Sequence, residues 1–309
     1  MEKIKITSYR ACKLFFIIDK ILLYKSTKIG ILLDDLFKFI GNIIQRPIKN
    51  KKANKIVESY DLNNIPIFKW VEIETFNRCN EQCSFCPVNI NEPQRPMALM
   101  QETIFKKIIN ELVELNFTGN LNLFSNNEPF LDSRIFSFAK YAYEKLPSAK
   151  KKIMTNGSVL TIEKCEHILP YIDELFIDNY NDNLVFNPTT KQIYDHFKDT
   201  KYSKKIIICM RKRNEILSSR GGFAPNKKTA KTKAKCVLPF RQLVIRPTGK
   251  VSLCCNDPLG KYTLGDVTQN SLKEIWYSQT YKDIRKKMLE KGRFSIKSCI
   301  NCDFTTLTI

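Results

Sequence analysis

Between Trp70 and Arg211, short β-rich runs alternate with stretches of helical periodicity, and this alternation limits the possible folds more than any other feature of the chain. It is typical of βα units on a largely parallel sheet, and the intervening segments have the length that parallel crossovers need. The expected strands are Val71–Phe76, Asn120–Ser125, Lys152–Thr155, Glu174–Asp178 and Ile206–Met210. The expected helices are Met100–Asn116, Ser133–Lys145, Ile162–Leu169 and Lys191–Phe197. We therefore predict an α/β fold.

Three cysteines, Cys79, Cys83 and Cys86, follow the first expected strand within eight residues. This position predicts a loop at the C-terminal end of the strand, where α/β barrels collect their catalytic groups. Three thiolates can hold a cubane iron–sulfur cluster and leave its fourth iron open to an exogenous ligand. A structural zinc site is the alternative, but it requires four ligands and the next cysteine is distant in sequence. The motif therefore favours a catalytic cluster.

The spacing of these cysteines, with the aromatic Phe85 before the last, resembles the signature of the radical S-adenosylmethionine (SAM) superfamily. The resemblance implies a partial (β/α)6 barrel with a [4Fe–4S] cluster on Cys79, Cys83 and Cys86. It implies that the open iron binds SAM and that the reduced cluster cleaves it to methionine and a 5′-deoxyadenosyl radical, which abstracts a substrate hydrogen. Reduction of the cluster implies an electron donor such as flavodoxin or ferredoxin.

Two further segments continue the resemblance. Ser125-Asn126-Asn127-Glu128-Pro129 follows the second expected strand, where the family usually carries Gly-Gly-Glu-Pro to receive the amino group of SAM. Thr155-Asn156-Gly157 follows the third, although Asn-Gly is also a common turn signal. The resemblance therefore assigns SAM binding to Asn126, Asn127, Glu128, Thr155 and Asn156.

Two arginines beyond the fifth expected strand are candidate ligand-binding residues. Arg211 could pair with the methionine carboxylate, because guanidinium binds carboxylate through two hydrogen bonds. Arg220, before Gly221-Gly222, could reach a substrate hydroxyl or phosphate. Each could also be a surface arginine, which is the commoner role.

A lysine-rich linker, Lys227–Lys235, leads into a differently built tail. The tail predicts a hairpin of Gln242–Arg246 and Val251–Cys255, followed by a helix that opens at Ser271 with Glu274 in the capping-box position. We therefore divide the chain into an N-terminal extension (1–66), a radical SAM core (67–225) and an auxiliary iron–sulfur domain (226–309).

The tail also carries four cysteines, Cys236, Cys254, Cys299 and Cys302, separated by 18, 45 and 3 residues. The pattern resembles the single-cluster, shortened (twitch-type) form of the SPASM domain, in the arrangement seen in radical dehydrogenases of aminocyclitols. It implies a second [4Fe–4S] cluster, and zinc is the alternative. Cys254 and Cys255 should point to opposite faces of a strand, so only one ligates, and the resemblance selects Cys254. The remaining cysteines, which have no partner at ligand spacing, are expected to be buried apolar residues: Cys12, Cys165 and Cys209.

Residues 1–66 form a basic extension with two apolar-periodic segments, Leu14–Tyr24 and Ile31–Ile44, which end before Arg46-Pro47 and the lysine cluster Lys49–Lys55. The periodicity predicts amphipathic helices. They are expected to pack on the main domain, and the alternative is a peripheral contact with a membrane.

The net charge of +20 would favour acidic partners, although a lysine-rich solvated surface is the preferred explanation, because charge alone identifies no partner. No nucleic-acid-binding motif is recognised. The first apolar run carries Asp19 and Lys20, which argues against a signal peptide, and the apolar stretches are shorter than the roughly 20 residues that cross a bilayer. We expect a cytoplasmic protein.

Two enzymatic functions fit these observations. In the first, the auxiliary cluster takes the second electron while a hydroxyl-bearing carbon of a sugar, cyclitol or other small molecule is oxidised. The basic linker favours an anionic substrate. In the second, the tail presents a peptide or protein side chain, as in related maturases; these usually carry two auxiliary clusters and a peptide-recognition domain, which residues 1–66 do not resemble. A non-enzymatic iron–sulfur protein that binds nucleic acid does not explain the open three-cysteine site.

Overall fold

A computed structural model describes residues 3–8, 46–227 and 232–305. In these residues one sheet has nine strands in the order β1-β6-β5-β4-β3-β2-β7-β8-β9. The strands from β1 to β7 are mutually parallel, and β8 and β9 are antiparallel additions. The strands are β1 (Lys5–Ser8), β2 (Trp70–Ile73), β3 (Asn120–Asn122), β4 (Lys150–Thr155), β5 (Glu174–Tyr180), β6 (Ile206–Arg211), β7 (Gln242–Ile245), β8 (Lys250–Ser252) and β9 (Thr263–Asp266).

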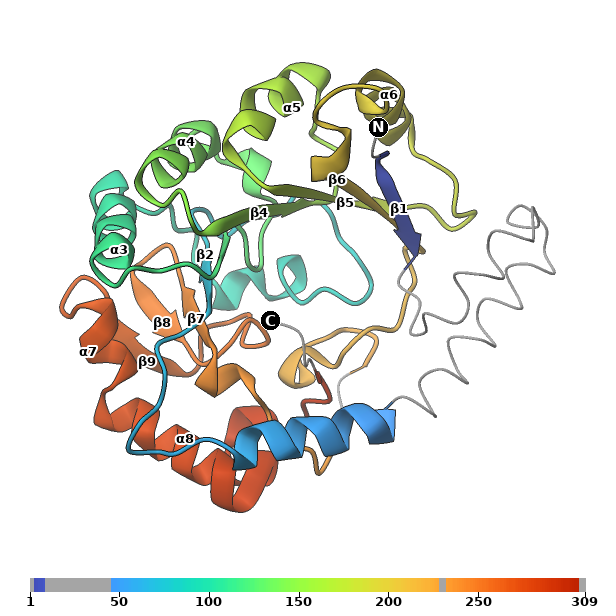
Figure 1. Ribbon diagram of the computed structural model, residues 1–309. Helices are drawn as coiled ribbons and strands as arrows, with labels where there is room; N and C mark the ends of the chain where they lie inside the picture. Colours follow the sequence, from blue (N-terminus) through green and yellow to red (C-terminus); the bar gives the residue numbers. More distant parts are fainter. Residues whose placement is uncertain (1–2, 9–45, 228–231, 306–309) are drawn as a thin grey trace.

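Four helices alternate with strands β2–β6 and surround the curved sheet from outside (Figure 1). They are α3 (Glu102–Glu114), α4 (Ile135–Lys145), α5 (Ile162–Ile168) and α6 (Pro188–Phe197). Helix α3 is representative, because its apolar residues Phe105, Ile108, Ile109 and Leu112 recur at helical spacing and are all buried. The predicted α/β fold with a parallel sheet is confirmed.

The sixth place in the barrel is filled differently from the prediction. The core supplies five parallel strands, β2–β6, and the strand beyond β6 is β1, from the N-terminal residues. The prediction of a purely helical extension was therefore wrong for residues 5–8. The apolar side chain of Ile4 is 6% exposed, so this end of the chain packs on the core. The predicted helices Leu14–Tyr24 and Ile31–Ile44 lie outside the described residues.

Residues 46–58 are helical, and the predicted end of the apolar segment Ile31–Ile44 before Arg46-Pro47 lies outside the described residues. The lysines do not disfavour a helix, since the opposite side buries Ala53 and Val57, which are one turn apart. Asn54 Oδ1 accepts a hydrogen bond from the Lys235 backbone N at 2.8 Å. This helix therefore contacts the start of the tail.

The tail extends the barrel sheet, because β7 pairs in parallel with β2 on the edge away from β3. Two helices follow β9, namely α7 (Leu272–Trp276) and α8 (Gln279–Lys291). The predicted capping box is present, with Ser271 Oγ accepting from Glu274 N at 3.2 Å and Glu274 Oε2 accepting from Ser271 N at 2.8 Å. Strand β8 ends at Ser252, so Cys254 and Cys255 lie in the following turn and not on the predicted strand.

Candidate functional site

The first cysteine group occupies the loop after β2, as predicted. Cys79, Cys83 and Cys86 are all half-buried, and the loop is tightened by the Cys86 backbone N, which donates to Cys83 O at 3.0 Å. Burial, together with the charges of Glu128 and Cys86, raises the pKa of Cys79 to about 11. Burial and the charges of Cys86 and Cys79 raise the pKa of Cys83 to about 12. Thiolates here therefore need a compensating cation, which the iron of a cluster would supply.

Neighbouring side chains hold this loop in place. Asn89 Nδ2 donates to the carbonyl of Cys79 at 3.1 Å and to that of Glu81 at 2.6 Å. The ring of Phe85 packs against Tyr180 at the end of β5, with ring centroids 5.7 Å apart. The aromatic residue of the motif therefore anchors the loop to the opposite side of the barrel opening.

Glu128, Thr155 and Asn156 converge beside Cys79, as the resemblance implies. The buried Glu128 carboxylate accepts from Thr155 Oγ1 and from the Asn156 backbone N, both at 2.8 Å. Asn156 Nδ2 lies 3.7 Å from Cys79 Sγ. Burial raises the pKa of Glu128. Since Glu128 already ties two strand ends together, its contact with the SAM amino group stays a prediction.

Asn126 and Asn127 replace the family's glycines without strain, since neither has a positive φ. Asn126 Nδ2 donates to the Cys255 carbonyl at 3.1 Å, and its Oδ1 accepts from Arg220 Nη2. Asn127 Oδ1 accepts from Ser125 N at 2.9 Å, while its buried Nδ2 has no partner. Asn126 therefore joins the end of β3 to the tail.

Arg211 lies at the end of β6 and is engaged by two carboxylates. Its Nε donates to Asp178 Oδ1 at 2.7 Å, and its Nη1 is 3.5 Å from Glu215 Oε2. Burial alone would lower the pKa of Arg211, but the charge of Asp178 outweighs it and holds the pKa well above the usual range. To bind the SAM carboxylate, Arg211 would have to contact it in addition to Asp178 and Glu215. The predicted role of Arg211 in SAM binding therefore stays a prediction.

The second cysteine group is assembled by the tail alone. Cys236, Cys299 and Cys302 are buried, and the charges of all three act on the half-buried Cys254. Burial raises the pKa of Cys254 well above that of a free thiol. The guanidinium of Arg293 donates to the Ala234 carbonyl at 2.7 Å beside this group, and its charge favours the Cys302 thiolate. The four predicted ligands are thus neighbours.

Cys255 faces elsewhere. Its thiol feels the charges of Glu72 and Arg220 more strongly than that of Cys236, and its backbone N donates to Gln242 Oε1 at 3.3 Å. This arrangement supports the choice of Cys254 as ligand, although the reason is a turn and not opposite faces of a strand. In the described residues no three His, Cys, Asp or Glu side chains surround a point suited to one metal ion. In a cubane cluster each thiolate binds a different iron, so the search for a site around one ion does not test for a cluster.

A buried polar cluster inside the barrel was missed by the sequence analysis. Glu72 and Glu74 alternate along and just beyond β2 with the apolar Val71 and Ile73, a pattern that signals a strand with one polar face turned inward. We call the following residues the interior polar cluster: Glu72, Glu74, Arg95, Ser125, Asn126, Arg220, Gln242, Arg246 and Cys255.

Ion pairs and hydrogen bonds hold this cluster together. Glu74 pairs with Arg95 and with Arg246, the latter at 3.2 Å. Glu72 accepts from Ser125 Oγ at 2.8 Å and from Gln242 Nε2 at 2.9 Å. Burial raises the pKa of Glu72 to about 7. Since Asn126 is near Glu128 in the chain and Cys255 follows Cys254, the cluster connects the two cysteine groups.

Two linker lysines are engaged in ion pairs. Lys227 pairs with Asp303, and Lys235 pairs with Glu58 at 2.8 Å. These pairs give the two lysines a structural role, so they weaken the argument from the linker to an anionic substrate. Residues 228–231 lie outside the description.

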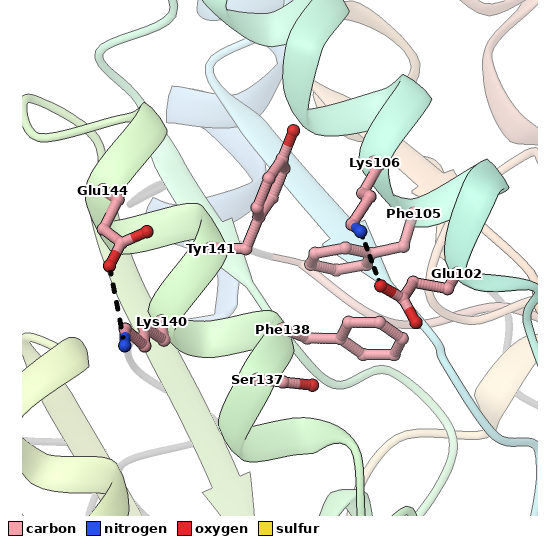
Figure 2. Close-up of a pocket in the computed structure, with 8 residues that line it drawn as sticks. All are labelled: Glu102, Phe105, Lys106, Ser137, Phe138, Lys140, Tyr141 and Glu144. Carbon is pink, nitrogen blue, oxygen red and sulfur yellow. Dashed lines mark ion pairs between the residues drawn. The ribbon is translucent and has the colours of Figure 1, made fainter.

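A shallow hollow on the surface is unrelated to the cysteines (Figure 2). Its lining comes from α3 and α4, on the outside of the barrel, and includes Phe105, Phe138 and Tyr141. Ion pairs within each helix border it, Lys106 with Glu102 at 2.6 Å and Lys140 with Glu144 at 4.0 Å.

No helix in the described residues is long and apolar enough to cross a membrane.

Comparison with known proteins assigns the tail to a family. Residues 236–303 match the SPASM family, described as an iron–sulfur cluster-binding domain. The chain is 25% identical over 240 residues to the S-adenosyl-L-methionine-dependent 2-deoxy-scyllo-inosamine dehydrogenase of Niallia circulans, covering 77% of this chain and 93% of that protein.

Solved structures show the same fold. The crystal structure of BtrN in complex with AdoMet and 2-DOIA superposes with a TM-score of 0.69 at 23% identity, covering 78% of this chain and 95% of that one. Streptococcus suis SuiB bound to precursor peptide SuiA superposes with a TM-score of 0.54 at 13% identity, covering 87% and 77%.

Proposed function

Because this chain is a radical SAM enzyme with a SPASM-type C-terminal iron–sulfur domain, we propose that it oxidises a hydroxyl-bearing carbon of a small polyol such as a cyclitol or sugar. The interior polar cluster carries this proposal, since it connects the two cysteine groups and presents both carboxylate and guanidinium groups. Polyol hydroxyls both donate and accept hydrogen bonds, so they match such a lining. The similarity to a dehydrogenase of 2-deoxy-scyllo-inosamine supports the substrate class.

The cofactors are iron–sulfur clusters and SAM, and their ligands belong to the proposal. Cys79, Cys83 and Cys86 would hold a [4Fe–4S] cluster with SAM at its open iron, and four tail cysteines would hold a second. Together these groups supply a 5′-deoxyadenosyl radical and an acceptor for one electron. The proposed SAM-contacting residues are Asn126, Asn127, Glu128, Thr155, Asn156 and Arg211, and the proposed tail ligands are Cys236, Cys254, Cys299 and Cys302.

The chain's own residues would position the substrate and exclude water. Glu74, Arg95 and Arg246 form a buried ion-pair network that keeps the cluster's shape without a ligand. Tyr180, at the end of β5, packs on Phe85 and covers the first cysteine loop from that side. Arg220 would bind a substrate oxygen. Exclusion of water protects a carbon radical from side reactions.

A peptide-modifying role is the weaker candidate. The likeness to SuiB, at 13% identity, concerns the fold alone, whereas the chain spans 93% of the small-molecule dehydrogenase.

An acidic electron donor such as flavodoxin or ferredoxin suits the net charge of +20, and so does a peripheral membrane contact of the N-terminal residues. We also propose that residues 67–225 form the core domain and residues 226–309 the auxiliary domain, with one sheet running through both.

Deuterium transfer tests the proposed function. The anaerobically reconstituted enzyme would be incubated with SAM, a reductant and 2-deoxy-scyllo-inosamine or related cyclitols and sugars deuterated at each hydroxyl-bearing carbon. We expect one 5′-deoxyadenosine per product two hydrogens lighter, with deuterium from the oxidised carbon in the deoxyadenosine. Transfer from a peptide side chain, with none from any polyol, would decide for the maturase role.

A further inference from the structure

Glu72 is a buried carboxylate with unused hydrogen-bonding capacity. It is 3% exposed, and its two oxygens each accept one hydrogen bond from a neutral donor, Ser125 Oγ and Gln242 Nε2. Within the described part of the chain it forms no ion pair, whereas Glu74, two residues along, pairs with two arginines. Because a carboxylate oxygen can accept two hydrogen bonds, Glu72 retains places for a ligand donor.

Arg220 supplies the complementary group. Its Nη2 is held by Asn126 Oδ1, while its buried Nε has no hydrogen-bond partner. The backbone of Arg220 has a φ of 50°, a conformation that non-glycine residues seldom adopt, before Gly221 at 68°. The surrounding loop therefore holds an unsatisfied donor, and its charge acts on Glu72. The unpartnered Nε–H of Arg220 can donate to a hydroxyl oxygen, and the Glu72 carboxylate can accept one more hydrogen bond from the same hydroxyl, which is donor and acceptor at once.

The following inference rests on the proposed function. We propose that Glu72 accepts the proton of the reacting substrate hydroxyl while Arg220 Nε–H donates to the same oxygen. The carbon loses one hydrogen atom to the 5′-deoxyadenosyl radical, which becomes 5′-deoxyadenosine. The hydroxyl loses its proton to Glu72. One electron leaves to an oxidised iron–sulfur cluster, and the C–O bond becomes a carbonyl whose oxygen Arg220 still binds. Two hydrogens and two electrons are thus accounted for.

The electrostatic surroundings suit Glu72 to this role. Burial raises its pKa to about 7, against the lowering effects of Ser125, Arg246 and Arg220, and with a smaller raising effect from Glu74. Cys255 faces it from the turn after β8. A base works best when its pKa lies near the working pH. Product formation should therefore fall as the medium becomes more acidic and Glu72 becomes protonated.

The test compares Glu72→Gln with Glu174→Gln, a matched control on β5 whose carboxylate pairs with Lys150 and Lys152 at the surface. The measured quantity is the ratio of dehydrogenated product to deuterated 5′-deoxyadenosine for the polyol that the wild type oxidises. We expect Glu72→Gln to keep deuterium transfer and to lower this ratio about 100-fold or more, the typical effect of losing a general base. The control should match the wild type.

Three outcomes would contradict the inference, and they are distinguishable. Wild-type deuterium transfer with an unchanged ratio in Glu72→Gln would overturn the role of Glu72 alone. Loss of both transfer and product in Glu72→Gln, with its fold intact, would make Glu72 a binding residue and not a base. Absence of transfer in the wild type from every polyol would overturn the proposed function, and this inference with it.

An infrared titration of the chain without substrate gives a readout that does not depend on turnover. A protonated-carboxyl band that titrates near neutral pH should be present in the wild type and Glu174→Gln and absent in Glu72→Gln. Its absence from the wild type would contradict the inference. If Glu72→Gln does not fold, the product ratio of the wild type decides, because it should fall from neutral to mildly acidic pH; a flat ratio would count against Glu72.

Discussion

At the scale of single residues, the neighbouring Cys254 and Cys255 separate the two halves of the site. Cys254 lies with Cys236, Cys299 and Cys302, whereas Cys255 faces the interior polar cluster. We expect Cys254→Ala to lower the iron content of the reconstituted chain from about eight to about four per chain, because a cubane needs its fourth thiolate. Cys255→Ala is the matched control and should keep about eight. Loss of iron in Cys255→Ala but not in Cys254→Ala would mean that Cys255, and not Cys254, binds the second cluster.

Glu72 also makes a prediction about stability. Its pKa is raised from 4.5 to about 7 on folding, so folding favours the protonated form. Its contribution to stability is full below about pH 4.5 and is lost as the pH rises through about 7. The free energy of unfolding of Glu72→Gln, relative to the wild type, should therefore increase with pH by up to about 3 kcal/mol.

Urea unfolding of the cluster-free chain across this pH range would measure the difference. For Glu174→Gln we expect a pH dependence of the relative free energy of unfolding with the opposite sign. Burial acts to raise the pKa of Glu174, but hydrogen bonds from Lys150 and Lys152 outweigh this effect and lower the pKa. That variant should lose stability, relative to the wild type, as the pH rises toward about 4.5, and its relative stability should change little above that pH. A relative stability of Glu72→Gln that does not change with pH would contradict the prediction.

At the scale of elements, β1 tests whether the N-terminal residues belong to the barrel. Ile4 is 6% exposed and joins the main core, while Ile6, on β1, is 38% exposed. Ile4→Ala should lower the free energy of unfolding by about 2–5 kcal/mol, as expected for a truncated core side chain. Ile6→Ala should cost less than about 1 kcal/mol. Equal effects of the two substitutions, measured by urea unfolding, would show that β1 does not dock as described.

At the scale of the whole molecule, one sheet runs from β1 through the barrel into the tail, so the two cysteine-bearing regions should unfold together. The chain has two tryptophans, Trp70 on β2 and Trp276 on α7. We expect the fluorescence midpoint of each single-tryptophan variant, Trp276→Phe and Trp70→Phe, to coincide with its own far-ultraviolet circular dichroism midpoint in urea. Separate midpoints would mean that core and tail unfold independently.

The sequence by itself determined the local features of this protein. The βα alternation, the cysteine loop after β2 and the capping box at Ser271 were all predictable, because each depends on residues close together in the chain. The four tail cysteines were selected by the resemblance of their spacing to a family domain, and their role as ligands stays a prediction. The sequence did not predict β1, because a four-residue edge strand has little signal of its own and is held in place by β6.

The tertiary structure alone decided the surroundings of the proposed reacting site. Glu72, Gln242 and Arg220 come from three separate segments and meet only when β7 pairs with β2 and the loop of Arg220 reaches Asn126. It also turned Cys254 and Cys255 apart in a turn after β8, and engaged Arg211 with two carboxylates. Burial and the charge of distant residues shift the pKa values of Glu72, Arg211, Cys254 and Cys255, and both properties arise only when the chain is folded.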